Sequence, residues 1–481
     1  MNVKRNLLLL LFFAQTLVAF SLKPAVVEGN APFAKNRQLR FYTCNDLLLQ
    51  HRVLRATAPV DDKGYFKVQI PVEETSLLTI ACNTTFGSFF VEPQKQYQVE
   101  LSADEELLKL FEAQQFGYSI AIKMTAYDTA ELNCKINRFE YYYNRFLYHY
   151  GDFFYRHIPQ HTYDSLMSLF ADKFSVNSLA TDYYSVYVRY RLAYIDLLYD
   201  GKNTQKLYDK YLDNPYIFYN NTAYMEFFDQ FFENYLYAGT KKISKKILYE
   251  NINNRVNYYK LLDEMGKDPI LVNEKIREMV FIKGMGELYG LSQEFNRTNI
   301  LLLLYQMQKE SKFAEHRIMA ENMINHLMAL KPKTEAPDFV LKDVYNSPVR
   351  LSDLKGKYVY LHFFTAYCEE CIREMLILKS IQEEYKDTLQ IVSIMLDFEP
   401  TGLYHFVTAN KEFDWLFLHF DGNYDFIDAY GVYGLPLGIL IDAQGKMVSS
   451  LAKSPAQGLR LQFLSIFPTP EKPKDSQRYR Y

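Results

Sequence analysis

Residues 363–375 read FFTAYCEECIREM, and this stretch decides how the C-terminal part of the chain folds. An apolar run ends within it and a segment with apolar residues at helical spacing follows, so Cys368 and Cys371 lie where a buried strand gives way to a helix. A thiolate at a helix start is stabilised by the positive end of the helix dipole and by free backbone N–H groups. We therefore expect Cys368 to be the attacking thiol and Cys371, one turn further on, to resolve a mixed disulfide.

Two other interpretations of the cysteine pair stay open. A C-x-x-C pair can supply half of a zinc site, but the chain contains no second C-x-x-C and no H-x-x-H to complete four ligands. The pair can also form a purely structural short-loop disulfide. The strand–CxxC–helix context favours a redox-active disulfide, so we expect no metal and no other cofactor.

The beginning of the chain has the pattern of a secretory signal peptide. Lys4 and Arg5 precede a mostly apolar run, Asn6–Phe20, which predicts a signal over residues 1–21; uncleaved, it would be a short membrane anchor. No later stretch approaches the ~20 apolar residues of a membrane span. We therefore expect a mature protein without a stable membrane span, in the periplasm or otherwise outside the cytoplasm, where disulfide chemistry is available.

The sequence pattern predicts a multidomain chain. Short alternating segments at regular spacing, such as Tyr65–Ile70, predict a β-sandwich over residues 22–103. Residues 104–330 have few Gly and Pro and carry apolar residues at helical spacing, which predicts an all-α domain. A proline-containing linker at residues 331–336 leads to alternating strands and helices over residues 337–466, an α/β domain, and residues 467–481 are expected to be a disordered tail.

The α/β segment resembles a known family. Residues 335–466 are similar to the thioredoxin-like domain of the TlpA/ResA-like extracytoplasmic thiol–disulfide oxidoreductases. The resemblance covers the opening strand, the central strand with its approach to the cysteines, the C-x-x-C-x-x-E-M run and the cis-proline segment; these are Ala336–Phe339, Gly356–Cys368, Cys368–Met375 and Gly434–Pro436. It implies a thioredoxin-like fold for this domain.

The resemblance also implies roles for neighbouring residues. Pro436 would follow a cis peptide bond opposite the cysteines and leave the backbone of Leu435 free to pair with an extended substrate segment. Tyr367 stands where the family usually has tryptophan and would supply an aromatic wall for the substrate. Glu374 corresponds to a glutamate linked to proton handling, although an exposed helix glutamate is the alternative. His362 would either relay protons to Cys371 or be a core histidine.

The chain departs from the family pattern at two places in this helix. Leu376 replaces a common proline, so the helix is expected to be straighter. Glu369 and Glu370 stand between the cysteines, and two carboxylates should raise the pKa of both thiols. We therefore expect a weak oxidant, hence a reductase, tuned by these glutamates.

Three cysteines lie outside the motif. Cys44 and Cys82 both fall in the predicted β-sandwich, and whether they pair stays open. Cys134 is expected to be a buried small hydrophobe.

The leading hypothesis is an enzyme that reduces disulfide-containing envelope proteins; the resemblance implies a membrane thiol donor upstream. A peroxidase is an alternative, because Thr365 to Cys368 has the T-x-x-C spacing of peroxiredoxins, although the proline expected near position 361 is absent. A third hypothesis is a scaffold whose N-terminal half recruits a client. The near-zero net charge of −3 predicts no nucleic-acid partner.

Overall fold

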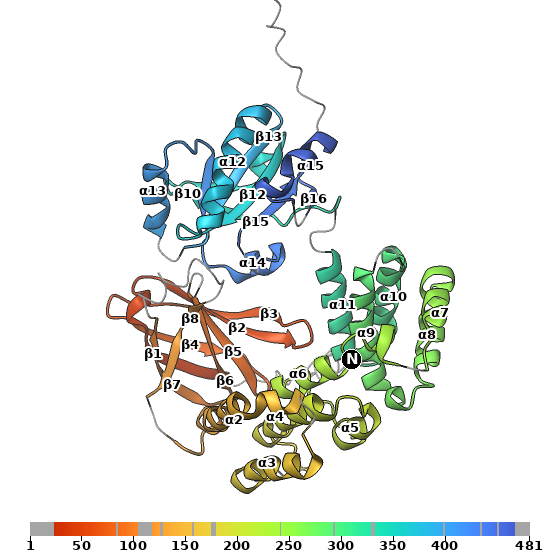
Figure 1. Cartoon of the computed structure of the whole chain (residues 1–481). Coiled ribbons are helices and arrows are strands. Elements are labelled where there is room, and N and C mark those ends of the chain that lie inside the picture. The colour runs from red at the N-terminus through yellow and green to blue at the C-terminus, as the bar shows by residue number, and fades with distance from the viewer. Residues whose placement is uncertain are drawn as a thin grey trace, which may run out of the picture.

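The computed structural model describes residues 24–466, except for 83–84, 104–117, 126–127, 156–157, 175–178, 241, 292–293, 329–331, 398–399, 433–434 and 450–451. The predicted signal peptide, residues 1–21, and the predicted tail, residues 467–481, lie outside the described residues. Figure 1 shows a strand-rich N-terminal part, a helical middle part and a C-terminal part in which helices cover a sheet.

The N-terminal part consists of two sheets around one core. The sheets have the strand orders β4-β1-β7-β9 and β3-β2-β5-β6-β8. Their strands are β1 Ala25–Asn30, β2 Gln38–Asp46, β3 His51–Pro59, β4 Tyr65–Ile70, β5 Ser76–Cys82, β6 Thr85–Val91, β7 Gln96–Ser102, β8 Tyr118–Ser119 and β9 Ala121–Met124. Alternate residues of both sheets point into a shared cluster that includes Val27, Phe41 and Ile80. The sequence predicts that the strands end at residue 103, but β8 and β9 extend the sheets to Met124.

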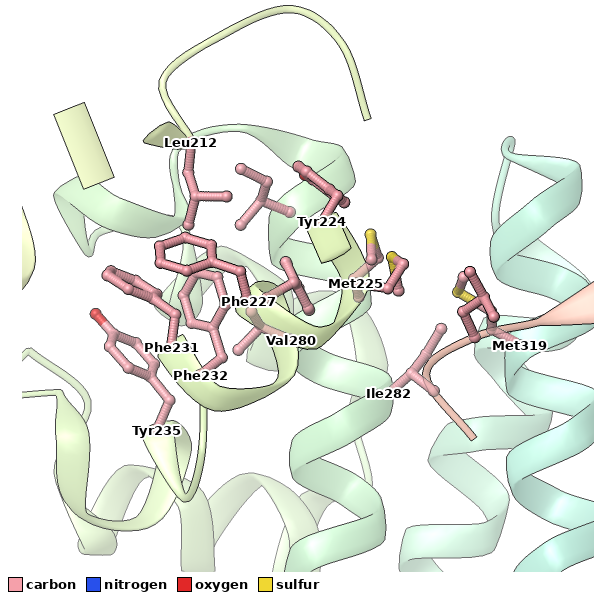
Figure 2. Packing of buried hydrophobic residues seen from close by; sticks show 14 of the residues in the cluster. Leu212, Tyr224, Met225, Phe227, Phe231, Phe232, Tyr235, Val280, Ile282 and Met319 are labelled. Atoms are coloured by element: carbon pink, nitrogen blue, oxygen red, sulfur yellow. The ribbon is translucent and has the colours of Figure 1, made fainter. Parts of the chain in front are cut away.

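The helical middle part is held by a large aromatic core. Its helices are α2 Leu132–Tyr155, α3 Gln160–Lys173, α4 Tyr183–Asp200, α5 Thr204–Tyr211, α6 Thr222–Phe231, α7 Lys245–Tyr249, α8 Tyr258–Met265, α9 Glu274–Gly290, α10 Arg297–Glu310 and α11 Ala314–Met328. Figure 2 shows Phe227 and Phe231 of α6 packed beside Val280 of α9. Burying one such side chain contributes about 1.5–3 kcal/mol, so this cluster is a main source of stability.

Local sequence explains where several of these helices begin. The side chain of Asp182 accepts a backbone N–H at the start of α4, and Asn221, Asn257, Asn273 and Asn296 do the same for α6, α8, α9 and α10. Asp and Asn are among the favoured N-cap residues because the cap oxygen satisfies a donor that the helix leaves free.

The C-terminal part is a seven-stranded sheet with the order β11-β10-β14-β13-β12-β15-β16. Its strands are β10 Val340–Asp343, β11 Pro348–Arg350, β12 Tyr358–Phe364, β13 Leu389–Met395, β14 Leu416–His419, β15 Leu437–Ile441 and β16 Met447–Ser449, and its helices are α12 Glu369–Tyr385, α13 Pro400–Ala409, α14 Tyr424–Tyr430 and α15 Leu459–Ile466. The opening strand predicted at 336–339 instead begins at Val340. Pro337 has no N–H to donate, and the Ala336 N–H bonds to the Gly445 carbonyl in a different segment.

The central strand β12 is buried on both faces. It pairs in parallel with β13 and antiparallel with β15. Leu361 and Phe363 pack on the side of α14, whereas Tyr360 and Phe364 pack on the side of α12. A strand covered on both faces reads as a continuous apolar run, which is why the sequence YVYLHFF predicts it.

The N-terminal sheets contact the C-terminal part through α14. Tyr42 of β2 and Ala81 of β5 are fully buried in the same cluster as Phe426 and Tyr430 of α14. The Arg40 guanidinium donates to the main-chain oxygen of Asp421 at 3.1 Å. Figure 1 shows α14 between the N-terminal sheets and the C-terminal sheet. The N-terminal part thus packs against the segment that leads to Pro436.

Within the described part of the chain, no helix has the combined length and apolar character that crossing a membrane requires.

Candidate active site

The cysteine pair lies at the start of α12. Cys368 is the N-cap residue, and its Sγ accepts the Cys371 N–H at 3.1 Å. The Cys368 N–H donates to the Thr365 carbonyl at 3.2 Å, which closes a turn between the end of β12 and the helix. The two cysteines form a disulfide, in which Cys368 is 4% exposed and Cys371 is 0% exposed. Both cysteines are thus buried, and Cys368 is the slightly more exposed of the two.

The cis-proline lies next to this pair. The Leu435–Pro436 peptide bond is cis, as the resemblance implies. Leu435 is partly buried and packs against the cluster that contains Cys368 and Cys371. Tyr367 is 47% exposed immediately before Cys368. Gly434, the first residue of the predicted motif, lies outside the described residues.

Glu374 is buried, not an exposed helix residue. It is 4% exposed, and its Oε2 lies 3.8 Å from the Nε2 of His362. Burial raises the pKa of the Glu374 carboxyl, and a hydrogen bond with Ser454 opposes that shift. Burial also lowers the pKa of His362 to about 3, so its imidazole is neutral near pH 7. Glu374 and His362 do not form an ion pair, because the histidine carries no charge. They do not form a hydrogen bond either, because 3.8 Å is too long for one.

His362, on β12, is fully buried. Its Nδ1 lies 3.4 Å from the Ser393 hydroxyl, which also accepts the Trp415 indole N–H at 2.8 Å. Within the described ranges, its Nε2 has no hydrogen-bond partner, and neither does the buried Tyr360 hydroxyl two residues earlier. A Cβ at Gly438 would lie 2.1 Å from that hydroxyl, so only glycine leaves room for it. The sequence did not predict Tyr360 as part of this site. The feature that could have indicated it is its position two residues before His362, which puts both side chains on the same face of the strand.

The two glutamates between the cysteines face solvent. The side chain of Glu369 is 91% exposed and that of Glu370 is 53% exposed. Arg373 lies within 3.9 Å and 3.2 Å of their carboxylates. This cation lies one turn along the helix from the two glutamates and did not enter the predicted thiol pKa values. Solvent and Arg373 both weaken the field of these carboxylates at the sulfurs, so their effect on the thiols is smaller than the sequence alone suggests.

Asp397 is a second buried carboxyl residue at the site, and the sequence analysis missed it. It lies just past the end of β13, after Leu396, is 6% exposed, and its Oδ2 accepts the Ala366 N–H at 2.9 Å. Burial raises the pKa of this carboxyl to about 6. Its sequence signal is an acidic residue immediately after the apolar run LQIVSIML.

Cys44 and Cys82 lie in different hydrophobic clusters and form no disulfide with each other in the described part of the chain. Cys44 packs against the helical core, whereas Cys82 is buried in the core between the sheets. Cys134 is half-buried on α2 rather than fully buried as predicted. Among the residues that the structure describes, no group of three or more His, Cys, Asp or Glu is placed to hold a metal ion.

Comparisons with known proteins agree on this region. A model of the Redoxin family matches residues 331–455. "Thiol-disulfide oxidoreductase ResA" of Bacillus thuringiensis subsp. konkukian is 33% identical over 119 residues, which are 24% of this chain and 67% of the relative. ResA of Geobacillus thermodenitrificans is 31% identical over 153 residues, 31% of this chain and 82% of the relative.

A solved structure of a putative thiol-disulfide oxidoreductase from Bacteroides vulgatus is 28% identical. It covers 29% of this chain and 96% of its own, with a TM-score of 0.26, which supports no conclusion about the rest of the chain. The membership rests on the sequence relatives and on the Redoxin match. Through its C-terminal part, the chain belongs to the ResA family of thiol–disulfide oxidoreductases.

Proposed function

We propose that the protein is an extracytoplasmic thiol–disulfide oxidoreductase that reduces disulfides in envelope proteins with the pair Cys368 and Cys371. The observation that carries this proposal is the position of Cys368: it caps a helix, is slightly more exposed than Cys371, and belongs to the cluster against which Leu435 of the cis-proline segment packs. Family membership supports the reaction class. The predicted signal peptide supports the location.

The proposed reaction has two exchange steps. The Cys368 thiolate attacks one sulfur of a client disulfide, forms a mixed disulfide and releases the first client thiolate. Cys371 then loses its proton and attacks the Sγ of Cys368, which forms the Cys368–Cys371 disulfide and releases the second client thiolate. Two electrons pass to the client, and the released thiolates take up two protons. An external dithiol donor, which we propose to be a membrane protein, must then reduce the Cys368–Cys371 disulfide.

Glu374 is the proposed proton acceptor for Cys371. Its side chain is buried on the same helix, and its raised pKa favours holding a proton more than an exposed glutamate would. We propose that His362 stays neutral as a buried polar neighbour of Glu374 and does not itself take up the proton of Cys371. Tyr367 and the backbone of Leu435, before Pro436, are the proposed contacts for the client segment.

Trapping variants test the proposed order of attack. In Cys371→Ser, Cys368 can form the mixed disulfide but nothing resolves it, so a covalent complex with a disulfide-containing substrate should accumulate. Cys368→Ser should form no such complex, and Cys134→Ser should behave as wild type. A complex that accumulates through Cys371 in the Cys368→Ser variant would contradict the proposal.

We further propose that the chain divides into a strand-rich unit, a helical unit and a redox unit, and that the N-terminal units help to place a client. The packing of Tyr42 and Ala81 in the cluster of α14 supports this proposal, because α14 leads to the cis-proline segment. Cell fractionation with an antibody to the mature chain tests the proposed location.

A further inference from the structure

Asp397 lies at the edge of the sheet where the cysteine pair begins. Strands β12 and β13 run in parallel, with Phe364 opposite Met395, so the residues that follow both strands meet at one edge. Asp397 follows β13, and Ala366 follows β12. The Asp397 Oδ2 accepts the Ala366 N–H at 2.9 Å, while its Oδ1 is buried with no hydrogen-bond partner among the residues that the structure describes.

Burial of the ionised Asp397 carboxylate lowers the stability of the folded protein. A buried carboxylate with one backbone hydrogen bond loses most of its hydration and recovers only part of it. The Nε2 of His419, on the neighbouring strand β14, lies 2.9 Å from the main-chain oxygen of Asp397 and does not bond to its carboxylate. None of the described ion pairs includes Asp397. The first turn of α13, the next helix along the chain, contains no acidic residue that would add negative charge beside Asp397. Glu369 and Glu370, on the other side of the turn, point to solvent. A buried carboxylate that costs stability, with one backbone hydrogen bond and no described cation to offset that cost, is a candidate for function.

The hydrogen bond to Ala366 connects Asp397 to the reactive sulfur. Ala366 and Tyr367 are the middle residues of the turn that the Cys368 N–H closes onto the Thr365 carbonyl. That turn places Cys368 at the N-cap of α12. A hydrogen bond to an ionised acceptor is roughly twice as strong as one to a neutral acceptor. The turn is therefore held more firmly when Asp397 is ionised.

We propose that Asp397 is a positioning residue for thiol–disulfide exchange: its carboxylate holds the turn that presents Cys368, so the charge on Asp397 sets the reactivity of that thiol. The proposal rests on the proposed role of Cys368. Because the pKa of Asp397 is about 6, the reactivity of Cys368 should rise through a separate step near pH 6, below the ionisation of the thiol itself.

The test is the rate at which iodoacetamide alkylates Cys368 in the reduced, full-length mature protein between pH 4.5 and 9. Mass spectrometry of the Cys368 peptide distinguishes this thiol from Cys44, Cys82 and Cys134. Wild type should show a several-fold step near pH 6. Asp397→Asn keeps an acceptor for Ala366 but does not titrate, so the step should disappear. Asp397→Ser cannot reach Ala366, so the step should disappear and the rate at pH 8 should fall several-fold below that of Asp397→Asn.

Two control variants isolate the effect. Asp387→Asn changes an exposed aspartate before the other end of β13 and should keep the wild-type profile. Glu383→Gln changes an exposed glutamate of α12 and should also keep the wild-type profile. Trp415 fluorescence confirms that each variant is folded, and the near-isosteric Asp397→Asn serves if Asp397→Ser does not fold.

A step near pH 6 that survives in Asp397→Asn, or that wild type lacks, would overturn the proposal. So would equal rates at pH 8 for folded Asp397→Ser and Asp397→Asn. The proposed function fails by a different result, the absence of a trapped complex in Cys371→Ser, so the two failures can be told apart.

Discussion

Glu374 shows how burial gives one side chain a chemical role. The carboxyl lies in a pocket where desolvation disfavours its charge, and its pKa is raised from the ordinary value of glutamate. At a pH below that raised pKa it keeps its proton; above it, the carboxylate can accept the proton of Cys371.

Glu374→Gln should therefore slow the resolving step by up to about 10²-fold and remove that step's rise with pH through the raised pKa. The measurement is the decay of a preformed mixed disulfide between pH 4.5 and 8. The exposed Glu383 on the same helix provides the control, since Glu383→Gln should decay as wild type. Unchanged decay in Glu374→Gln would remove Glu374 from the proton path.

Asp397 should also leave a signature in stability. Its pKa is about 6 in the folded protein, against about 3.9 for an unfolded chain. The folded state therefore binds more protons between these values, and stability falls as pH rises through this window. Above pH 6 the cost is fully present; near pH 4 and below it is relieved.

Asp397→Asn removes that cost, so the variant should be more stable than wild type at pH 8 and similar to it at pH 4. Urea unfolding followed by Trp415 fluorescence measures this, since the single tryptophan lies in the C-terminal part and binds Ser393. A stability difference of the same size at both pH values would mean that the carboxyl does not titrate as described.

At the scale of single elements, the start of α12 places two carboxylates and one cation near the cysteines, and their opposing effects on the thiol pKa values can be compared. The sequence places two carboxylates between the cysteines and thereby predicts raised thiol pKa values. The structure adds Arg373 and solvent around both carboxylates. Exposed ion pairs are worth about 0.2–1 kcal/mol, which is less than one pKa unit.

Replacing Glu369 and Glu370 with Gln should consequently lower the pKa of Cys368 by only a few tenths of a unit. Arg373→Gln should raise it by a similar amount, because it removes the cation that offsets them. Thiolate absorbance near 240 nm during a pH titration measures both. A drop of more than about one unit in the double variant would show that the carboxylates dominate the site.

Sequence pattern predicted the elements with strong local signals. The apolar run of β12 and the helix after the cysteines were found where expected, and the cis bond before Pro436 is present as the family resemblance implies. The edge strand β3 was missed, because its exposed face is polar and its sequence HRVLRATAP does not alternate cleanly. The burial of Glu374 and the contact between Asp397 and Ala366 were beyond local pattern, because they depend on how distant segments pack.

At the scale of the whole molecule, the N-terminal sheets pack on the redox unit beside its cis-proline segment. Tyr42 is fully buried in the cluster that contains Tyr430 and, at its margin, Leu435. We expect this packing to fix the backbone that a client would pair with. A small reagent does not need that backbone, whereas a protein client does.

Tyr42→Ala should therefore raise the KM for a protein disulfide substrate several-fold, with little change in the alkylation rate of Cys368. Phe41→Ala is the matched control, since Phe41 is buried in the core between the N-terminal sheets and not against α14. Equal changes in KM for the two variants would show that general destabilisation, not the contact with α14, is responsible.

The central claim is that Cys368 and Cys371 form an exchangeable pair that works as a reductase. The most direct test is the reduction potential of this pair, measured by equilibrating the mature protein in dithiothreitol and glutathione buffers and counting trapped thiols by mass spectrometry. We predict a value near the thioredoxin end of the range, about −270 mV. A value near −120 mV, or a pair that never exchanges, would contradict the claim.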